Sequence, residues 1–193
     1  MPVADLKPRS LEASSQSIGT FMSSLAVTVL GHDRPGIIAD ATSALTDLGG
    51  NLEDTSMTLL RGHFVMTLVV STDADAETVR SALETKFAGA DLDVIVMDLH
   101  SVEAPTGRGE SYVLSVHGAD RVGIVAAITS VLASHGANIT DLTTRLGGGL
   151  YIVIAEVDIP ADVSVPDLEA AIADVATDLG VGATLRPAET DVL

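Results

Sequence analysis

Two stretches of this chain combine glycines, acidic residues and an asparagine in an order that suits binding of a small charged molecule. Residues 31–54 read GHDRPGIIADATSALTDLGGNLED, and residues 118–141 read GADRVGIVAAITSVLASHGANITD. The two stretches align without a gap and share 12 of 24 residues. A repeat of this length indicates two copies of one small domain.

The start of each stretch is expected to form a turn that leads into a helix. The first N–H groups of a helix have no internal partner, and together with the helix dipole they attract an anion. Gly36 and Gly123 carry no Cβ, so a ligand can approach the backbone closely there. Asp33 and Asp120 have short carboxylates that can cap the helix or hold a ligand ammonium group.

An asparagine follows each expected helix, at the start of the next strand. The side-chain amides of Asn51 and Asn138 offer donors and an acceptor to a zwitterion. A purely structural interpretation also fits: the aspartates cap, the glycines permit the turn, and the asparagines become left-handed after Gly49 or Gly136. The recurrence of the whole set favours a binding function.

The segments around the first turn predict a β-α-β-β-α-β order. Residues 25–30 (LAVTVL) predict a buried strand, 51–60 and 63–71 an antiparallel hairpin, 75–87 a second helix and 92–98 a closing strand. Pro35 suits the first turn of the first helix. Apolar residues at helical spacing predict the stripe of that helix that faces the sheet: Ile37, Ile38, Ala41, Ala44, Leu45 and Leu48.

The second half of the chain repeats this pattern. The predicted fold class is therefore α+β, with two tandem ferredoxin-like βαββαβ domains, each a four-stranded antiparallel sheet with two helices on one face. The expected ranges are an N-terminal arm at 1–23, a first domain at 24–99, a linker at 100–110, a second domain at 111–187 and a tail at 188–193.

Composition excludes several functional classes. The net charge is −17 with only two lysines, which argues against direct binding of nucleic acid. The chain has no cysteine and no apolar run that approaches the length of a membrane span, and we expect a cytoplasmic protein. The five histidines lack metal-binding spacing, and no catalytic constellation is present. We therefore expect neither an enzyme nor a protein with a metal or cofactor.

The strand, the G-x-D-R-x-G-I-[IV] turn, the helix that ends in glycine and the following asparagine together resemble an ACT domain. The tandem arrangement is similar to the paired-ACT family of glycine cleavage system transcriptional repressors, over about residues 25–186. Formyltetrahydrofolate deformylases and uridylyltransferases carry similar modules, but those enzymes need a further catalytic domain, for which this chain has no room.

The resemblance implies a regulatory protein that binds a small molecule, an amino acid, at ACT-domain interfaces and modulates a partner protein in amino-acid metabolism or its transcriptional control. It also implies edge-to-edge pairing of ACT domains and a homodimer. The implied ligand-binding residues are Asp33, Arg34, Gly36, Ile37, Ile38, Asn51, Asp120, Arg121, Gly123, Ile124, Val125 and Asn138. The alternative is a dimerisation scaffold whose ACT domains bind no ligand. We expect Asn138→Ala and Gly123→Val each to remove binding at the second site and leave the fold largely intact.

Overall fold

The computed structural model describes residues 23–100 and 109–188. Residues 1–22 of the expected N-terminal arm, most of the expected linker and most of the expected tail lie outside these described residues, and Ser23 already belongs to a strand. The described residues form two compact units, one on each side of the gap.

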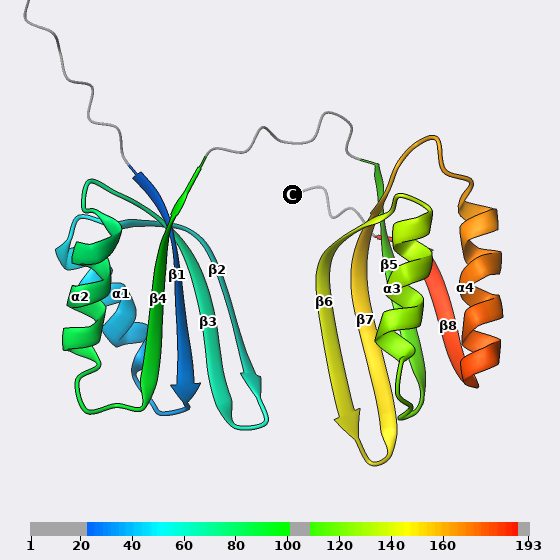
Figure 1. Cartoon of the computed structure of the whole chain (residues 1–193), viewed down its shortest axis with the longest axis horizontal. Coiled ribbons are helices and arrows are strands. Elements are labelled where there is room, and N and C mark those ends of the chain that lie inside the picture. Colours follow the sequence, from blue (N-terminus) through cyan, green and yellow to red (C-terminus); the bar gives the residue numbers. More distant parts are fainter. Residues whose placement is uncertain (1–22, 101–108, 189–193) are drawn as a thin grey trace, which may run out of the picture. The chain divides into compact units, whose positions relative to one another are not determined.

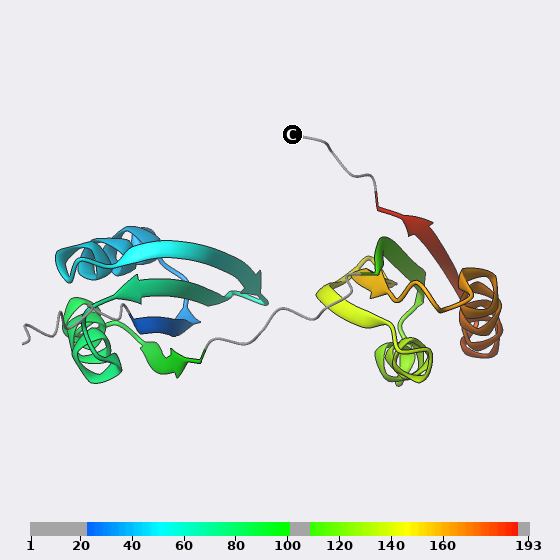
Figure 2. The same ribbon diagram turned by 90° about the horizontal axis from the view of Figure 1, so that it is seen from above.

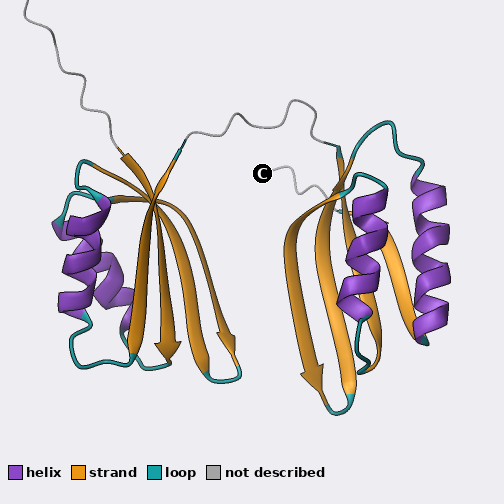
Figure 3. Cartoon of the chain, in the orientation of Figure 1, coloured by secondary structure: helices purple, strands orange, loops and turns teal. Residues whose placement is uncertain are grey.

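The first unit is a four-stranded sheet with two helices on one of its sides (Figures 1 and 3). Its elements are β1 (Ser23–His32), α1 (Ile37–Asp47), β2 (Asn51–Leu60), β3 (His63–Thr72), α2 (Ala76–Lys86) and β4 (Leu92–Leu99). The strand order is β2-β3-β1-β4, as Figure 2 shows from above, and every neighbouring pair is antiparallel.

The second unit repeats the arrangement with the order β6-β7-β5-β8. Its elements are β5 (Glu110–Ala119), α3 (Ile124–Ser134), β6 (Asn138–Gly147), β7 (Leu150–Ile159), α4 (Val165–Leu179) and β8 (Val181–Pro187). The prediction of two ferredoxin-like βαββαβ units is thus confirmed. None of the described helices is both long and apolar enough to cross a membrane.

Each unit has its own apolar core between the sheet and the helices. In β1, Leu25, Val27 and Val29 are fully buried, whereas the residues between them face the other side of the sheet. Leu30 is 41% exposed. The strand predicted to be buried over 25–30 is therefore buried on one face only.

Helix α1 begins later than the sequence predicts. Gly36 is its N-cap and Ile37 its first residue, so Pro35 lies outside the first helical turn. The predicted stripe is correct for Ile37, Ala41, Ala44 and Leu45, which are buried. Ile38 is 45% exposed, because it is turned by about 100° around the helix axis from Ile37.

Glycines end α1 and α3 in the same way. After α1, the N–H of Gly49 donates to the Thr46 carbonyl (2.9 Å) and the N–H of Gly50 to the Leu45 carbonyl (2.8 Å). Gly49 has φ 70°, and this left-handed residue with its pair of bonds is the Schellman motif. Gly136 has φ 71° after α3, with the equivalent bonds of 3.0 Å each. The predicted helix stops are confirmed.

The β2–β3 hairpin has the two-residue turn that the sequence predicts. Arg61 and Gly62 both have positive φ, 51° and 87°, which is the type I′ geometry that matches the twist of paired strands. The pairing register of β2 shifts between Leu52 and Asp54, and that of β6 shifts at the equivalent place. The duplicated units therefore share even this irregularity of the edge strand.

Candidate functional site

The turns before α1 and α3 have nearly the same backbone. Gly36 has φ 94° and Gly123 has φ 97°, in the left-handed region that side-chain-bearing residues rarely adopt. Each glycine is the N-cap of its helix, and no side chain caps either helix. The expectation that Asp33 and Asp120 cap these helices is therefore wrong. The reason is that the cap falls three residues after each aspartate.

The uncapped helix starts leave backbone donors available. The first helical bond of α1 runs from the N–H of Asp40 to the Gly36 carbonyl (2.8 Å), and that of α3 from Ala127 to Gly123 (2.9 Å). Three N–H groups precede each of these bonds, at residues 37–39 and 124–126. Ile37 and Ile124 are buried, so these two residues offer their backbone rather than their side chains.

A hollow of about 520 Å³ lies at the start of α1. It is lined by residues 33–39 together with Met57 of β2 and Phe64 of β3. The hollow thus brings Asp33, the backbone at residues 37–39 and apolar side chains to one place. Met57 and Phe64 were not predicted as site residues, because their positions fit the alternation of apolar and polar residues in a hairpin.

The arginines of the two turns have different surroundings. Nη2 of Arg34 pairs with Oδ2 of Asp40 at 2.9 Å, and Nη1 donates to the Pro35 carbonyl at 3.1 Å. Ala127 replaces Asp40 in the second unit. There the guanidinium of Arg121 lies 3.2 Å from where a Cβ on Gly180 would stand, at the end of α4. The negative end of a helix dipole suits a cation at this position.

The two asparagines begin their strands as predicted, but far from the turns of their own units. Asn51 pairs with Ser71, which also lies beside Ser24 at the start of β1, whereas the turn follows the other end of β1. Helix α1 has 11 residues and separates the two places by about 16 Å. Within one unit, Asn51 and the turn therefore cannot contact one small ligand. The same holds for Asn138 and the second turn.

The structural interpretation of the asparagines is also wrong. Among the described residues, Arg61 is the one non-glycine residue with positive φ, so neither asparagine is left-handed. Gly49 and Gly136 take that conformation themselves. Both asparagines are exposed at the beginning of an edge strand, where their amides are free to meet another molecule.

The first glycine of each repeat has a structural role. A Cβ on Gly31 would lie 2.1 Å from the backbone oxygen of Asp91, and one on Gly118 would lie 2.7 Å from the Val181 side chain. These glycines let the closing strand approach the first strand of each sheet. Their recurrence in the repeat therefore says nothing about a ligand.

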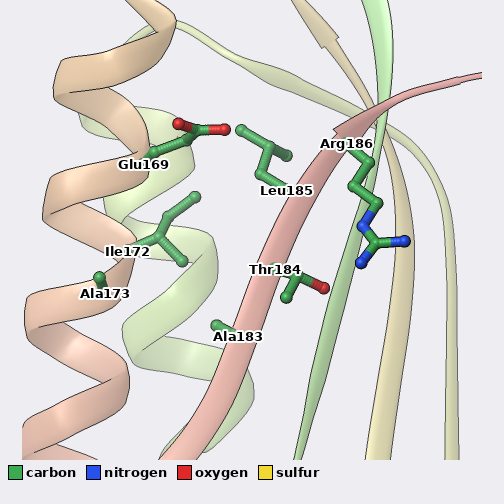
Figure 4. A pocket seen from close by; sticks show the side chains of 7 residues that line it. All are labelled: Glu169, Ile172, Ala173, Ala183, Thr184, Leu185 and Arg186. Carbon is green, nitrogen blue, oxygen red and sulfur yellow. The ribbon is translucent and has the colours of Figure 1, made fainter.

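Another hollow, of about 310 Å³, lies between α4 and β8 (Figure 4). Ile172 and Leu185 point into it, whereas the guanidinium of Arg186 points away from the helix. It contains none of the predicted site residues. Among the described residues, no group of three His, Asp or Glu side chains is placed to hold a metal ion.

The surroundings of Asp75 and Tyr112 shift the pKa values of these two side chains. Hydrogen bonding by Thr78 at the start of α2, through its side chain first and then through its backbone N–H, holds the pKa of Asp75 below its usual value. Burial raises the pKa of Tyr112, with a further contribution from its hydrogen bond to Glu110. Neither group has the surroundings of a general acid or base in a cleft.

The fold and the turns define the class: paired ferredoxin-like modules, each with a left-handed glycine at the start of its first helix. Two family models, both described as ACT domain, match residues 23–97 and 112–175, which is more than half of the chain. The chain belongs to the ACT-domain family and carries two ACT domains in tandem.

Several known proteins are similar to this chain. The glycine cleavage system transcriptional repressor of Escherichia coli is 30% identical over 123 residues, which are 63% of this chain and 64% of the repressor. The match thus spans less than two thirds of the repressor's length. A UPF0237 protein of Methanopyrus kandleri is 40% identical over 80 residues, which are 41% of this chain and 89% of that protein. The crystal structure of an unknown protein from Galdieria sulphuraria has a TM-score of 0.73 and 34% identity, and covers 86% of this chain and 99% of that one.

Proposed function

We propose that this chain is a non-catalytic regulatory protein whose ACT domains bind an amino acid and thereby change the activity of a partner protein. The hollow at the start of α1 carries the proposal. Its volume, about 520 Å³, lies within the range of small-molecule sites. Its lining combines backbone donors, a carboxylate and apolar side chains, which are the groups that an amino acid needs.

Each part of an amino acid has a matching group at the turn. The free N–H groups at residues 37–39 suit the α-carboxylate, since they stand at the positive end of the α1 dipole. The exposed carboxylate of Asp33 suits the ammonium group. Met57 and Phe64 suit an apolar side chain. In the second unit, the residues at the equivalent positions are Asp120, the amides of 124–126, Thr144 and Tyr151.

The asparagines take part in the proposed site through a second copy of the chain. Asn51 lies about 16 Å from the turn of its own unit, so it reaches a ligand only at another domain's turn. An antiparallel pairing of β2 with β2 of a second copy reverses one strand against the other. It thereby moves each Asn51 towards the opposite turn and joins two sheets into one of eight strands. Leu52, Leu59 and Leu60 on this edge are 39%, 47% and 49% exposed, which favours such pairing.

Regulation then follows from linkage. A ligand that contacts two domains binds the paired arrangement more tightly than the separated one, and it can shift the equilibrium only by that difference in affinity. The name of the E. coli relative points to control of gene expression. Because this chain has a net charge of −17, we propose that it acts on a partner protein rather than directly on DNA.

A thermal-shift screen against the twenty amino acids and a few folates at millimolar concentration tests the proposal. Ligand at 100 times its dissociation constant stabilises the bound form by about 2.7 kcal/mol, a rise of roughly 10 °C or more in melting temperature. We expect stabilisation by one amino acid or a narrow group. Asn138→Ala should weaken the response at the second site, whereas Thr140→Ala, a matched change on the same strand, should not.

The structure changes one part of the sequence-based design. Gly123 has φ 97°, so Gly123→Val strains the turn itself and does not separate binding from folding. A flat response to every compound would support the alternative, a scaffold whose turns bind nothing. If one amino acid stabilises the chain, capture of the partner protein from a lysate with and without that amino acid distinguishes a ligand-dependent regulator from a constitutive scaffold.

A further inference from the structure

The first sheet has an apolar face that its helices leave uncovered. In β1, Leu25, Val27 and Val29 face the helices, so Ala26, Thr28 and Leu30 face the opposite side. Strand pairing places Val65 and Val69 of β3, and Ile95 and Met97 of β4, on this side as well. We call this surface, formed by β3, β1 and β4, the bare face of the first sheet.

The most prominent side chains of the bare face are apolar. Leu30, Ile95 and Met97 are 41%, 53% and 58% exposed, and Leu99 at the end of β4 is 39% exposed. Asp93 at one corner is the only charged residue that β1, β3 and β4 place on this face between the levels of Ser24 and Leu30, and Asp54 of β2 lies at its border beside Val69. Apolar patches of this kind on a protein surface mark interaction sites more often than chance would give.

The polar groups at the centre of the bare face bond to each other. Thr28 Oγ1 and Thr67 Oγ1, on neighbouring strands, are 3.3 Å apart. Burying a hydroxyl without a partner is costly, whereas a pair bonded across two strands already has one. The centre of this face is therefore suited to the removal of water.

The equivalent face of the second sheet has a different character. Glu156 and Arg186 flank Val113 there, and His117 occupies the position equivalent to Leu30. Ser115 takes the place of Thr28. The first unit thus exposes a mainly apolar face, whereas the equivalent face of the second unit combines Ile154, which is 45% exposed, with charged side chains. The requirements of the fold do not explain this difference.

We infer that the bare face of the first sheet packs against the same face of a second copy of this chain. Two copies that each carry a charge of −17 repel each other, so they approach most easily through a surface with few charges, and here the carboxylates lie at the margin. The face also complements itself. Rotation of a second copy about an axis along β1 keeps each residue at its level, and so places the protruding Met97 over the flatter Val69, and Ile95 over Thr67.

The size of the bare face predicts a weak association. Three strands and seven residues cover roughly 14 Å by 24 Å. With the relief of the side chains, two such faces would bury on the order of 1,000 Å² in total, which is near the lower limit for a specific interface. The association should therefore depend on concentration in the micromolar range. It is separate from the pairing of β2 edges and requires no ligand.

Sedimentation of the full chain over about 5–500 µM, with no amino acid present, tests this inference. We expect the average mass to rise with concentration and to double. Ile95→Glu should abolish this doubling, because each of the two copies would then bring a carboxylate into the contact between their bare faces. The matched control is Thr184→Glu, at the equivalent position of β8, which adds the same charge and should leave the doubling unchanged.

A cross-linking experiment locates the contact, because the chain has no cysteine of its own. Packed sheets lie about 10 Å apart, so a short bis-maleimide should join two copies of Thr28→Cys. Ser115→Cys, half-buried at the equivalent place in the second sheet, serves as the control. Efficient linking of Thr28→Cys alone would support the inference. A mass that Ile95→Glu leaves unchanged, or equal linking of both variants, would overturn it, and neither result bears on amino-acid binding.

Discussion

The turn before α1 and the turn before α3 share a backbone and differ in charge. Gly36 and Gly123 have φ values within a few degrees of each other, yet Arg34 is paired with Asp40 whereas Arg121 has Ala127 in that place. The backbone is fixed because only glycine adopts this conformation easily at a helix start. The surrounding charges have no such constraint, so two similar turns can differ in their affinity for an anion.

The two units also differ at the end of the third strand of each. Thr72 is the one buried polar residue among the described residues, and its hydroxyl donates to the Leu48 carbonyl (3.2 Å) and accepts from the Ala74 N–H (3.1 Å). Ile159 occupies the equivalent position in the second unit and is also buried. The same buried position is thus stabilised by hydrogen bonds in the first unit and by apolar packing in the second.

The largest expected difference between the units is at their first glycines. In Gly31→Ala, the new methyl group collides with the backbone of Asp91, whereas in Gly118→Ala it meets the Val181 side chain, which can move. We expect a loss of about 3 kcal/mol in the first unit and about 1 kcal/mol in the second. Both tyrosines lie in the second unit, so tyrosine fluorescence in urea follows that unit, and circular dichroism follows both. A larger loss for Gly118→Ala would contradict this reading of the two contacts.

The buried hydroxyl of Thr72 provides the next comparison. Thr72→Val removes the partner of two partly buried backbone groups, which should cost about 1–3 kcal/mol of unfolding free energy. Ile159→Val removes one methylene group from the equivalent site and should cost about 0.5–1.5 kcal/mol. Urea denaturation measures both. If Thr72→Val proved no more costly than Ile159→Val, water would have to replace the lost hydrogen bonds.

A substitution can give the second turn the ion pair that the first turn has. Ala127→Asp should give Arg121 the partner that Arg34 has, and it adds a negative charge beside the proposed carboxylate site. We expect about tenfold weaker binding, or about 1.4 kcal/mol, of the amino acid that the thermal-shift screen identifies. Ala127→Asn has the same shape without the charge and should bind nearly as the parent does. Titration calorimetry measures both variants, and equal affinities would remove electrostatics as the cause.

The smallest expected effect is at the helix caps of α2 and α4. Asp75 accepts the N–H of Thr78 at 2.7 Å, whereas Ser164 before α4 makes no such bond. Because the pKa of Asp75 is lowered in the folded state, its contribution to stability is present above its unfolded pKa of about 3.9. It disappears as the pH falls through the folded value. Asp75→Ala should therefore lower the melting temperature by a few degrees at pH 7 and have no such effect near pH 2. Ser164→Ala should change little at either pH.

Much of the fold could be predicted, because the internal repeat indicates two domains and the spacing of apolar residues indicates their helices and strands. The strand ends at Asn51 and Leu60, and the hairpin start at His63, agree with the predicted residues, since turn chemistry fixes them locally. The helix start could not be placed in this way. Pro35 is a familiar first residue of a helix, but the left-handed conformation of Gly36 moves that start two residues further on. No pattern of residue types reveals such a dihedral angle.

The candidate site was only partly predictable. The turn and the asparagine are close to each other in the repeat, which suggests one site, but α1 carries the chain from one end of the sheet to the other between them. Met57 and Phe64 lie at the hollow because of the register between β2 and β3, and because α1 begins beside this hairpin. The sequence therefore identified the groups with suitable chemistry, and the distances between them depended on topology.

The bridge made by Thr72 has a consequence for motion in the first unit. Its hydroxyl joins the end of α1 to the residues that lead into α2, so the amide proton of Ala74 is exposed to solvent only when that junction opens. Its exchange with deuterium should therefore report how often the end of α1 separates from the sheet. The second unit lacks this bridge, so its two helices are free to fluctuate independently at the same junction. The first unit should accordingly open as a larger cooperative piece.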